Sequence, residues 1–166
     1  MRNSTPKIGD VFSVPLDEKS RRYFQCVAID HTQLDSDVIR VFKSTYQIDA
    51  QPDLHEIVSG EIAFYTHVIV KLGIKMKLWE KVGSVPYQEK ANVLFRHSWD
   101  FGKPGIKVSE RWCVWRINED FRNVGKLEGD FQKAEIGIVF APPDIVERMR
   151  TGAGPSDFVD PGYPGY

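Results

Sequence analysis

The side chains best suited to catalysis or metal binding are the four histidines, which are spread singly along the chain: His31, His55, His67 and His97. None of them forms a His-x-x-x-His or Glu-x-x-His pair, and the two cysteines do not form a Cys-x-x-Cys pair. A metal site commonly leaves such a local pair of ligands in the sequence. We therefore expect neither a metal nor a cofactor.

Enzymatic chemistry has one weak candidate, the pair His97 and Asp100, whose spacing at a strand end could orient an imidazole as a general base. With Glu110 these two residues suggest a small hydrolase or nuclease; the simpler interpretation is solvated or hydrogen-bonded side chains. The chain has no Gly-x-Ser-x-Gly elbow and neither of the glycine-rich phosphate-binding loops. We predict no catalytic residues.

Acidic side chains are concentrated in two segments, residues 23–39 and 44–70, which contain no Lys or Arg. If both segments fold onto one side, they form an acidic patch that steers a basic partner. The alternative is a set of ordinary solvated loops. We expect the following acids to contact a partner: Asp35, Asp37, Asp53 and Glu56.

Large aromatic side chains are the second candidate for an interface, because they dominate binding surfaces as well as cores. Trp112 and Trp115 are three residues apart in a predicted strand and should point to opposite faces. Trp99, beside Asp100 and a Gly-Pro loop, is the best interface anchor. We therefore add Trp99 and Asp100 to the predicted partner-binding residues.

Alternating apolar residues predict a series of short strands. Residues 11–15 and 23–29 should pair as a hairpin, and residues 38–42 should form a third strand. Alternation returns from 63 to 82, which predicts two more strands with a bulge or turn at Gly73. Residues 93–99 and 108–117 extend the sheet across a turn at 102–105.

Two short helices are expected among the strands. The first spans residues 52–60 and the second residues 142–152, each with proline near its start and glycine at its end. The fold class is thus α+β and mainly β. Its architecture should be a strongly bent antiparallel sheet or a small, partly open barrel.

The length of 166 residues fits one domain, which we expect at 1–150, followed by a Gly/Pro-rich tail at 151–166. The net charge of −1 argues against nucleic acid as the partner. No apolar run is long enough to span a membrane, and the start lacks a secretory signal. We expect a cytoplasmic protein in which Cys26 and Cys113 are buried free thiols.

Two segments resemble the immunity protein 26 family of bacterial polymorphic-toxin systems. Residues 8–16 (IGDVFSVPL) with 23–27 (YFQCV) are similar to its opening Gly-Asp-hydrophobic-Phe-x-hydrophobic-Pro-Leu strand and second strand. Residues 78–86 (LWEKVGSVP) are similar to its Trp-x-x-hydrophobic-Gly segment before a proline. The resemblance does not reach residues 93–166, and it carries over no catalytic residue.

The resemblance implies a cytoplasmic antidote that binds a cognate protein toxin and blocks it sterically. We expect it to be a monomer or weak homodimer before it meets the toxin. Three alternatives stay open beside this hypothesis. The first is a small-molecule or nucleotide-binding barrel with its ligand in the mouth, and the second is the small hydrolase. The third is a homo-oligomeric or regulatory interaction domain.

Overall fold

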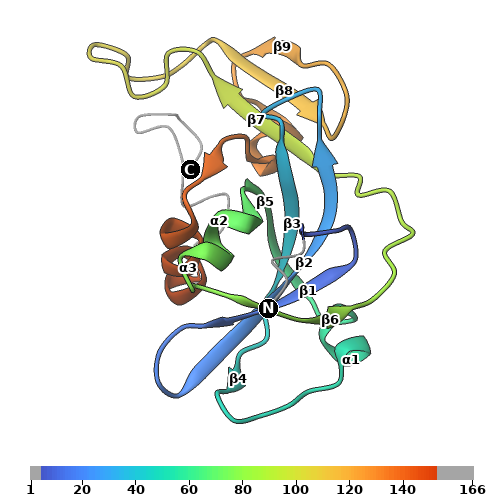
Figure 1. Ribbon diagram of the computed structural model, residues 1–166. Coiled ribbons are helices and arrows are strands. Elements are labelled where there is room, and N and C mark those ends of the chain that lie inside the picture. Colours follow the sequence, from blue (N-terminus) through green and yellow to red (C-terminus); the bar gives the residue numbers. More distant parts are fainter. Residues whose placement is uncertain (1–4, 153–166) are drawn as a thin grey trace.

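A computed structural model describes residues 5–152 of the chain as two open sheets with three α-helices (Figure 1). The larger sheet has the order β11-β5-β3-β2-β1-β6, with β4 paired to β2. Its strands are β1 (Asp10–Pro15), β2 (Ser20–Asp30), β3 (Ser36–Phe42), β4 (Tyr46–Gln47), β5 (Ile62–Val68), β6 (Glu80–Ser84) and β11 (Val139–Phe140).

The smaller sheet lies across one end of the larger one, at the top of Figure 1. Its order is β10-β7-β8-β9. The strands are β7 (Leu94–Ser98), β8 (Trp112–Arg116), β9 (Arg122–Gly125) and β10 (Glu135–Ile136). A 3₁₀ turn, η1 (Gly129–Lys133), leads from β9 into β10.

The mainly β α+β class is confirmed, and the strands are bent by bulges. The register shifts within β2 between Cys26 and Ala28 and within β3 between Val41 and Phe42. A bulge adds local twist and bends its strand. Most strand pairs are antiparallel, but β10 joins β7 and β11 joins β5 in parallel, so both sheets are mixed. The described strands do not close into a barrel.

The opening hairpin forms as predicted, with Phe12 opposite Phe24. The Asp17 carboxylate accepts hydrogen bonds from the backbone N–H groups of Lys19 and Ser20, at 2.8 and 2.7 Å. An aspartate that binds the backbone two and three residues ahead stabilises a tight turn. The third strand, predicted at 38–42, is also confirmed as part of β3.

The prediction of two strands joined by a bulge or turn across residues 63–82 is wrong for residues 70–75, which form a helix. The chain forms β5, then a short helix α2 (Val70–Lys75), and only then β6. A Cβ on Gly73 would lie 1.9 Å from Cζ2 of Trp79, so the helix packs directly on that indole. Trp79 Nε1 also donates to the carbonyl of Val70 over 3.0 Å. These tertiary contacts outweigh the alternating pattern, since local propensity is a weak determinant.

The two predicted helices are confirmed as α1 (Leu54–Val58) and α3 (Pro142–Thr151). Asp53 caps α1 by accepting from the N–H groups of His55 and Glu56. Gly152 ends α3 in the left-handed conformation, at φ 71°. Of the strand predicted at 108–117 only β8 forms, and β4, β9, β10 and β11 were not predicted.

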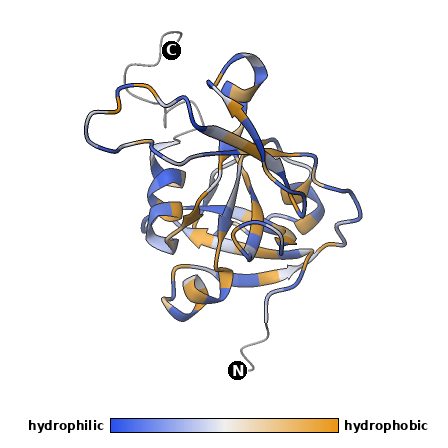
Figure 2. Cartoon of the chain, turned by 90° about the horizontal axis from the view of Figure 1, so that it is seen from above, coloured by the Kyte–Doolittle hydropathy of each residue, from blue (hydrophilic) through white to orange (hydrophobic). Residues whose placement is uncertain are grey.

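Three clusters of buried side chains make up the core, and Figure 2 shows hydrophobic segments along the strands in the middle of the molecule. The first cluster lies between the larger sheet and helices α2 and α3. The second joins Val27 and Val38 of the larger sheet to Phe95 and Trp115 of the smaller one. This shared cluster fixes the smaller sheet on the larger one.

Both cysteines are free and buried, as predicted: Cys26 lies in the first cluster and Cys113 in the second. No helix in residues 5–152 is long and apolar enough to cross a membrane. Of the tail predicted at 151–166, Thr151 and Gly152 belong to the end of α3, and the remainder lies outside the described residues.

Candidate functional site

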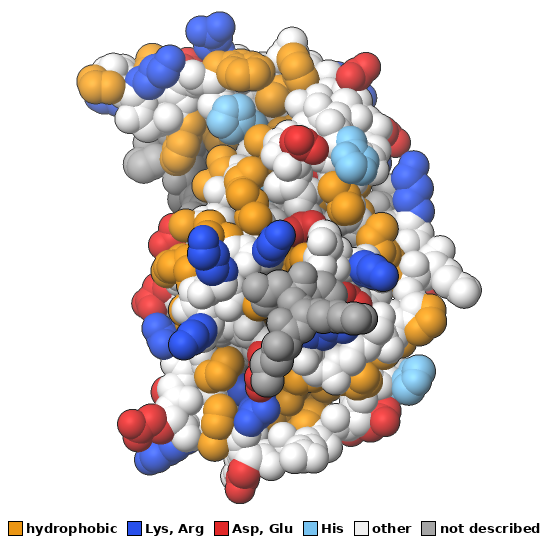
Figure 3. Space-filling view, in the orientation of Figure 1, with side chains coloured by type: hydrophobic (Ala, Val, Ile, Leu, Met, Phe, Trp, Pro, Cys, Tyr) orange, Lys and Arg blue, Asp and Glu red, His pale blue; other side chains and the backbone are white. Residues whose placement is uncertain are grey.

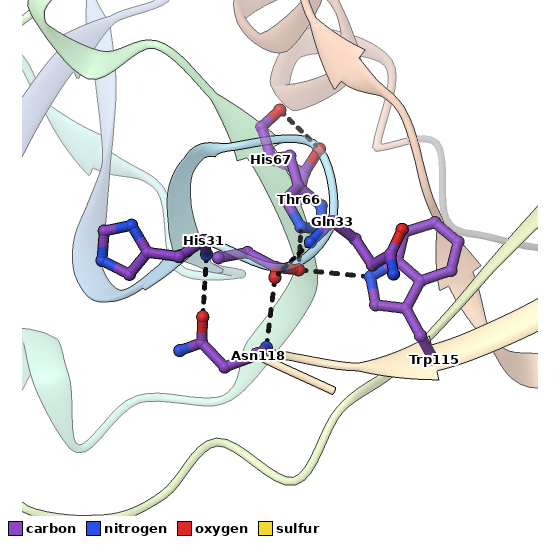
Figure 4. Close-up of polar contacts among 7 residues, drawn as sticks. His31, Gln33, Thr66, His67, Trp115 and Asn118 are labelled. Atoms are coloured by element: carbon purple, nitrogen blue, oxygen red, sulfur yellow. Dashed lines mark hydrogen bonds and ion pairs between the residues drawn. The ribbon is translucent and has the colours of Figure 1, made fainter. Parts of the chain in front are cut away.

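A buried aspartate connects the two sheets and positions the smaller one (Figure 4). The Asp30 carboxylate, at the end of β2, accepts hydrogen bonds from His67 Nε2 at 2.9 Å and from Trp115 Nε1 at 3.2 Å. It also accepts the backbone N–H groups of Gln33 and Asn118, both at 3.1 Å. Asp30 and His67 are fully buried. A buried carboxylate with four donors holds β2, β5 and β8 in one arrangement.

The protonation of this pair follows from its surroundings. Burial lowers the pKa of His67, because desolvation disfavours the charged imidazolium more than Asp30 favours it. Burial alone would raise the pKa of Asp30, but hydrogen bonds from His67, Gln33 and Asn118 lower it overall. Within residues 5–152, Nδ1 of His67 has no hydrogen-bond partner. A neutral imidazole that donates from Nε2 fits these contacts. The pair is enclosed and acts in positioning.

The loop from Trp99 to Arg111, which we call the β7–β8 loop, is held by a small hydrogen-bond network at its base. The Ser98 hydroxyl donates to the Asp100 carboxylate over 3.0 Å and accepts from the N–H of Phe101 over 3.0 Å. Ser109, fully buried, also donates to Asp100. These bonds lower the pKa of Asp100. Asp100 therefore orders the loop that carries Trp99 and Phe101.

Aromatic rings gather on the smaller sheet beside this loop. The ring centroid of Trp99 lies 5.4 Å from that of His97 and 5.8 Å from that of Phe121, both in edge-to-face geometry. Trp99 is 47% exposed and Phe121 42% exposed. We call Trp99, Phe121 and His97 the aromatic patch. Figure 3 shows hydrophobic side chains gathered over this end of the molecule, with Lys and Arg side chains around the projecting loop.

A cleft of about 230 Å³ adjoins the aromatic patch through His97. It lies where β7 meets β10 and β11, and its walls are largely apolar. We call it the side cleft, and its lining residues are Arg96, His97, Ser98, Phe101, Trp112, Ile136, Ile138 and Phe140. Phe101 and Ile138 are 43% and 42% exposed, whereas Trp112 is buried. Trp112 pairs with Ser98, and Trp115 pairs with Phe95, three positions earlier on β7. This register fits the predicted opposite orientation of the two tryptophans. Both indoles are buried.

Two of the predicted binding acids lie close together in the chain, Asp35 in the β2–β3 connection and Asp37 at the start of β3. Asp35 is exposed and lies 3.7 Å from Nδ1 of His31. Asp37 is half-buried and accepts the N–H of Val70 over 2.9 Å, at the start of α2. Burial raises the pKa of Asp37. Asp37 thus has a structural role, and Asp35 is the acid that is available to solvent.

The other two acids lie at the opposite end of the molecule. Asp53 caps α1, and Glu56 is exposed in its first turn. Helix α1 lies at the bottom of Figure 1, whereas the smaller sheet with Trp99 and Asp100 lies at the top. The six predicted residues therefore occupy three separate places. The acidic segments do not fold onto one surface, and a partner-binding role for each residue stays a prediction.

The catalytic alternative gains no geometric support. Asp100 bonds to Ser98 and Ser109, His97 packs on Trp99, and Glu110 lies 3.6 Å from Lys126. In the part of the chain that the structure describes, no three His, Cys, Asp or Glu side chains come together as a metal site would require. The sequence did not indicate that Phe101, Phe121 and Ile138 are exposed apolar side chains near this site. They lie in loops or beside very short strands, where no regular spacing of apolar residues shows which side chains face solvent.

The residues that carry the family resemblance lie around β1 and β6. Gly9 has φ 98°, and a Cβ there would lie 2.8 Å from the carbonyl oxygen of Val85. A Cβ on Gly83 would lie 2.4 Å from Cδ1 of Leu54, so α1 packs on β6 at this glycine. Trp79 packs on α2, as described above. The motif residues thus have structural roles in the larger sheet.

Comparison with known proteins identifies a family over this part of the chain. Residues 7–105, more than half of the chain, match the family described as Immunity protein 26. The match covers β1 to β7 and ends within the β7–β8 loop. Neither the curated proteins nor the solved structures contain a significant match. The chain belongs to the immunity protein 26 family.

Proposed function

We propose that this chain neutralises a cognate protein toxin by binding it stoichiometrically and covering its active site. Membership of an immunity protein family supports toxin immunity in general terms. The proposal adds the mechanism, which is steric and uses no catalytic residue or cofactor. It further places the chain in the cytoplasm, folds residues 1–150 as one domain, and treats the protein as a monomer or weak homodimer before toxin arrives.

The observation that carries the proposal is the aromatic patch. Trp99 and Phe121 expose nearly half of their surface, although large aromatic rings gain by burial. Tryptophan is strongly enriched among the residues that dominate binding energy at protein interfaces. The hydrogen bonds of Ser98 and Asp100 hold the adjoining loop, so little conformational entropy is lost on binding.

The predicted acids take different places in this proposal. Trp99 is the central contact, and Asp100 orders the loop beside it. Asp35 and Glu56 are exposed and can add electrostatic steering. Asp37 and Asp53 bond to backbone N–H groups at helix starts, so their contribution to the partner is secondary.

The test is to isolate the tagged protein from its native host and to measure the mass of the complex. We expect a 1:1 complex with a protein that is toxic without it. The double variant Trp99→Ala with Phe121→Ala should weaken binding by at least about 30-fold, which corresponds to about 2 kcal/mol. Leu72→Ala with Met76→Ala is the matched control, because these side chains, on α2 and at its C-cap, are similarly exposed.

A lone protein in this experiment, or a toxin complex that persists unchanged in the Trp99 and Phe121 variant, would contradict the proposal. Recognition of a small molecule is the second candidate, and the side cleft is the observation that favours it. Its volume lies below the ~300–1,000 Å³ of common ligand pockets. A thermal shift with a metabolite panel, in the absence of any protein, would support this second function.

A further inference from the structure

The β7–β8 loop carries three cationic side chains that form no ion pair within residues 5–152. Lys103, Lys107 and Arg111 are exposed, and in the described part of the chain no carboxylate lies within ion-pairing distance of them. Of the two acids of the loop, Asp100 bonds to serine hydroxyls and also feels the charges of Arg111 and Lys103, and Glu110 faces Lys126. The loop therefore presents a net positive surface.

Exposed apolar side chains accompany these cations. Phe101 and Ile138 form the rim of the side cleft, and Ile106 of the same loop is 39% exposed. A contiguous apolar surface bordered by charges is typical of an interaction site. The side cleft could hold an aromatic side chain, because a cavity of about 150 Å³ accommodates benzene. Its size suits one anchoring side chain better than a whole metabolite.

A buried indole in the side cleft adds a requirement for hydrogen bonding. Trp112 is only 5% exposed, and its Nε1–H has no hydrogen-bond partner within residues 5–152. A buried indole N–H normally finds an acceptor, because an unpaired donor costs about 1–3 kcal/mol. Because the nitrogen itself is covered, an occupant of the side cleft that brings an oxygen would pair with this donor only once the indole turns toward the cleft.

We infer that the side cleft and the β7–β8 loop bind an acidic segment of the partner protein, which places one large apolar side chain and one oxygen acceptor against Trp112. This inference rests on the proposed function and specifies its interface. Charge complementarity carries it, since Lys103, Lys107 and Arg111 attract carboxylates. It also reverses the partner charge expected from the acidic segments of the sequence.

Single-stranded nucleic acid shares the negative charge and stacking bases of such a partner. A net charge of −1 for the whole chain disfavours it, because nucleic-acid binders gain affinity from a broad basic surface. We therefore assign the surface to a protein segment. Binding of an oligothymidine probe in place of peptide would overturn this assignment.

The experiment follows the indole N–H resonances of the full-length protein by two-dimensional NMR, with Trp112→Phe used to assign the Trp112 signal. The probe is a short synthetic peptide with one phenylalanine flanked by aspartates. We expect a saturable downfield shift of the Trp112 indole proton. Two control peptides, one with lysines for the aspartates and one with glycine for the phenylalanine, should leave that proton in place.

Charge reversal on the whole protein completes the test. Lys103→Glu with Lys107→Glu should weaken peptide binding and slow toxin association by about tenfold at low salt, an effect that high salt removes. Lys71→Glu with Lys75→Glu, on the exposed face of α2, is the matched control. Phe101→Ala, at an exposed position, should speed dissociation without unfolding the protein.

The outcomes separate the inference from the proposed function. A toxin complex whose association rate is unchanged by the Lys103 and Lys107 reversal overturns the inference and leaves the function standing. Peptide binding at Trp112 in a protein that captures no toxin overturns the proposed function instead. An unmoved Trp112 resonance with every peptide overturns the inference in either case.

Discussion

The indole of Trp115 donates to the carboxylate of Asp30 across 3.2 Å, and this bond joins the smaller sheet to the larger one. The same carboxylate holds His67 of β5 at 2.9 Å. One buried carboxylate on β2 thus accepts hydrogen bonds from β5 of the same sheet and from β8 of the other sheet. The aromatic patch and the side cleft are built on the smaller sheet, so their position relative to the rest of the surface depends on Asp30.

The first prediction concerns this acceptor. Asp30→Asn replaces one carboxylate oxygen by an NH₂ group that must face donors, so at least one buried donor loses its partner. We expect the free energy of unfolding to fall by about 2–4 kcal/mol, measured by urea denaturation. Asp35→Asn, at the exposed neighbouring position, should change it by less than about 0.5 kcal/mol. Equal effects of the two substitutions would contradict the role of Asp30.

The second prediction concerns acid sensitivity. Burial lowers the pKa of His67 below its ordinary 6.5, so the unfolded chain takes up a proton before the folded one does. Stability should therefore fall as the pH drops below about 6.5, until the folded imidazole is protonated as well. His67→Gln should remove this part of the pH dependence. Unfolding curves between about pH 8 and pH 5 test it, and an identical slope in the variant would contradict it.

Glu135 should act in the opposite direction. Its side chain is 12% exposed, and burial raises its pKa from 4.5 to about 7 despite Arg148 at 3.6 Å. The folded state then holds its proton longer, so stability falls as the pH rises from about 4.5 to about 7. The size of this loss is at most about 3 kcal/mol.

Glu135→Gln cannot ionise and should be free of that loss. The stability of the variant relative to the parent should therefore rise with pH across the same interval. Denaturant unfolding at several pH values measures the difference. A constant difference between the two proteins would show that Glu135 titrates normally, with Arg148 as an effective counter-ion.

A fourth prediction tests the packing of α2. Gly73→Ala places a Cβ 1.9 Å from Cζ2 of Trp79, and this clash should outweigh the better helix propensity of alanine. We expect a loss of about 1–3 kcal/mol. Gly60→Ala is the control, because the added Cβ meets only the Ile57 carbonyl oxygen at 3.1 Å. A Gly73 variant as stable as the parent would mean that the indole can move aside at little cost.

The fifth prediction links loop order to binding. Ser98→Ala removes the acceptor for the Phe101 N–H and one donor to Asp100. We expect faster amide exchange at Phe101 and weaker toxin binding, since the partner must then order the loop. Ser59→Ala removes a comparable serine hydrogen bond at the end of α1 and should leave both quantities unchanged. Unaltered exchange at Phe101 would contradict the assigned role of Ser98.

Local sequence determined several parts of this protein. Alternation of apolar residues predicted the first three strands because side chains in a strand point to opposite faces in turn. Proline and glycine positions predicted α1 and α3. Proline is tolerated in the first turn of a helix because its missing N–H is not needed there, and glycine ends a helix because it adopts the left-handed conformation easily. The motifs in residues 8–16, 23–27 and 78–86 predicted the family that the match over residues 7–105 confirms.

Tertiary structure decided the rest, because the interactions involved join residues far apart in the chain. Residues 70–75 alternate as a strand would, yet the Trp79 indole against Gly73 makes them a helix. Asp30 and Trp115 are 85 positions apart, and no local pattern signals their hydrogen bond. The side cleft likewise draws on β7, β8, β10 and β11. Spacing in the sequence records neighbours along one element, whereas a site of this kind exists only after the sheets have packed together.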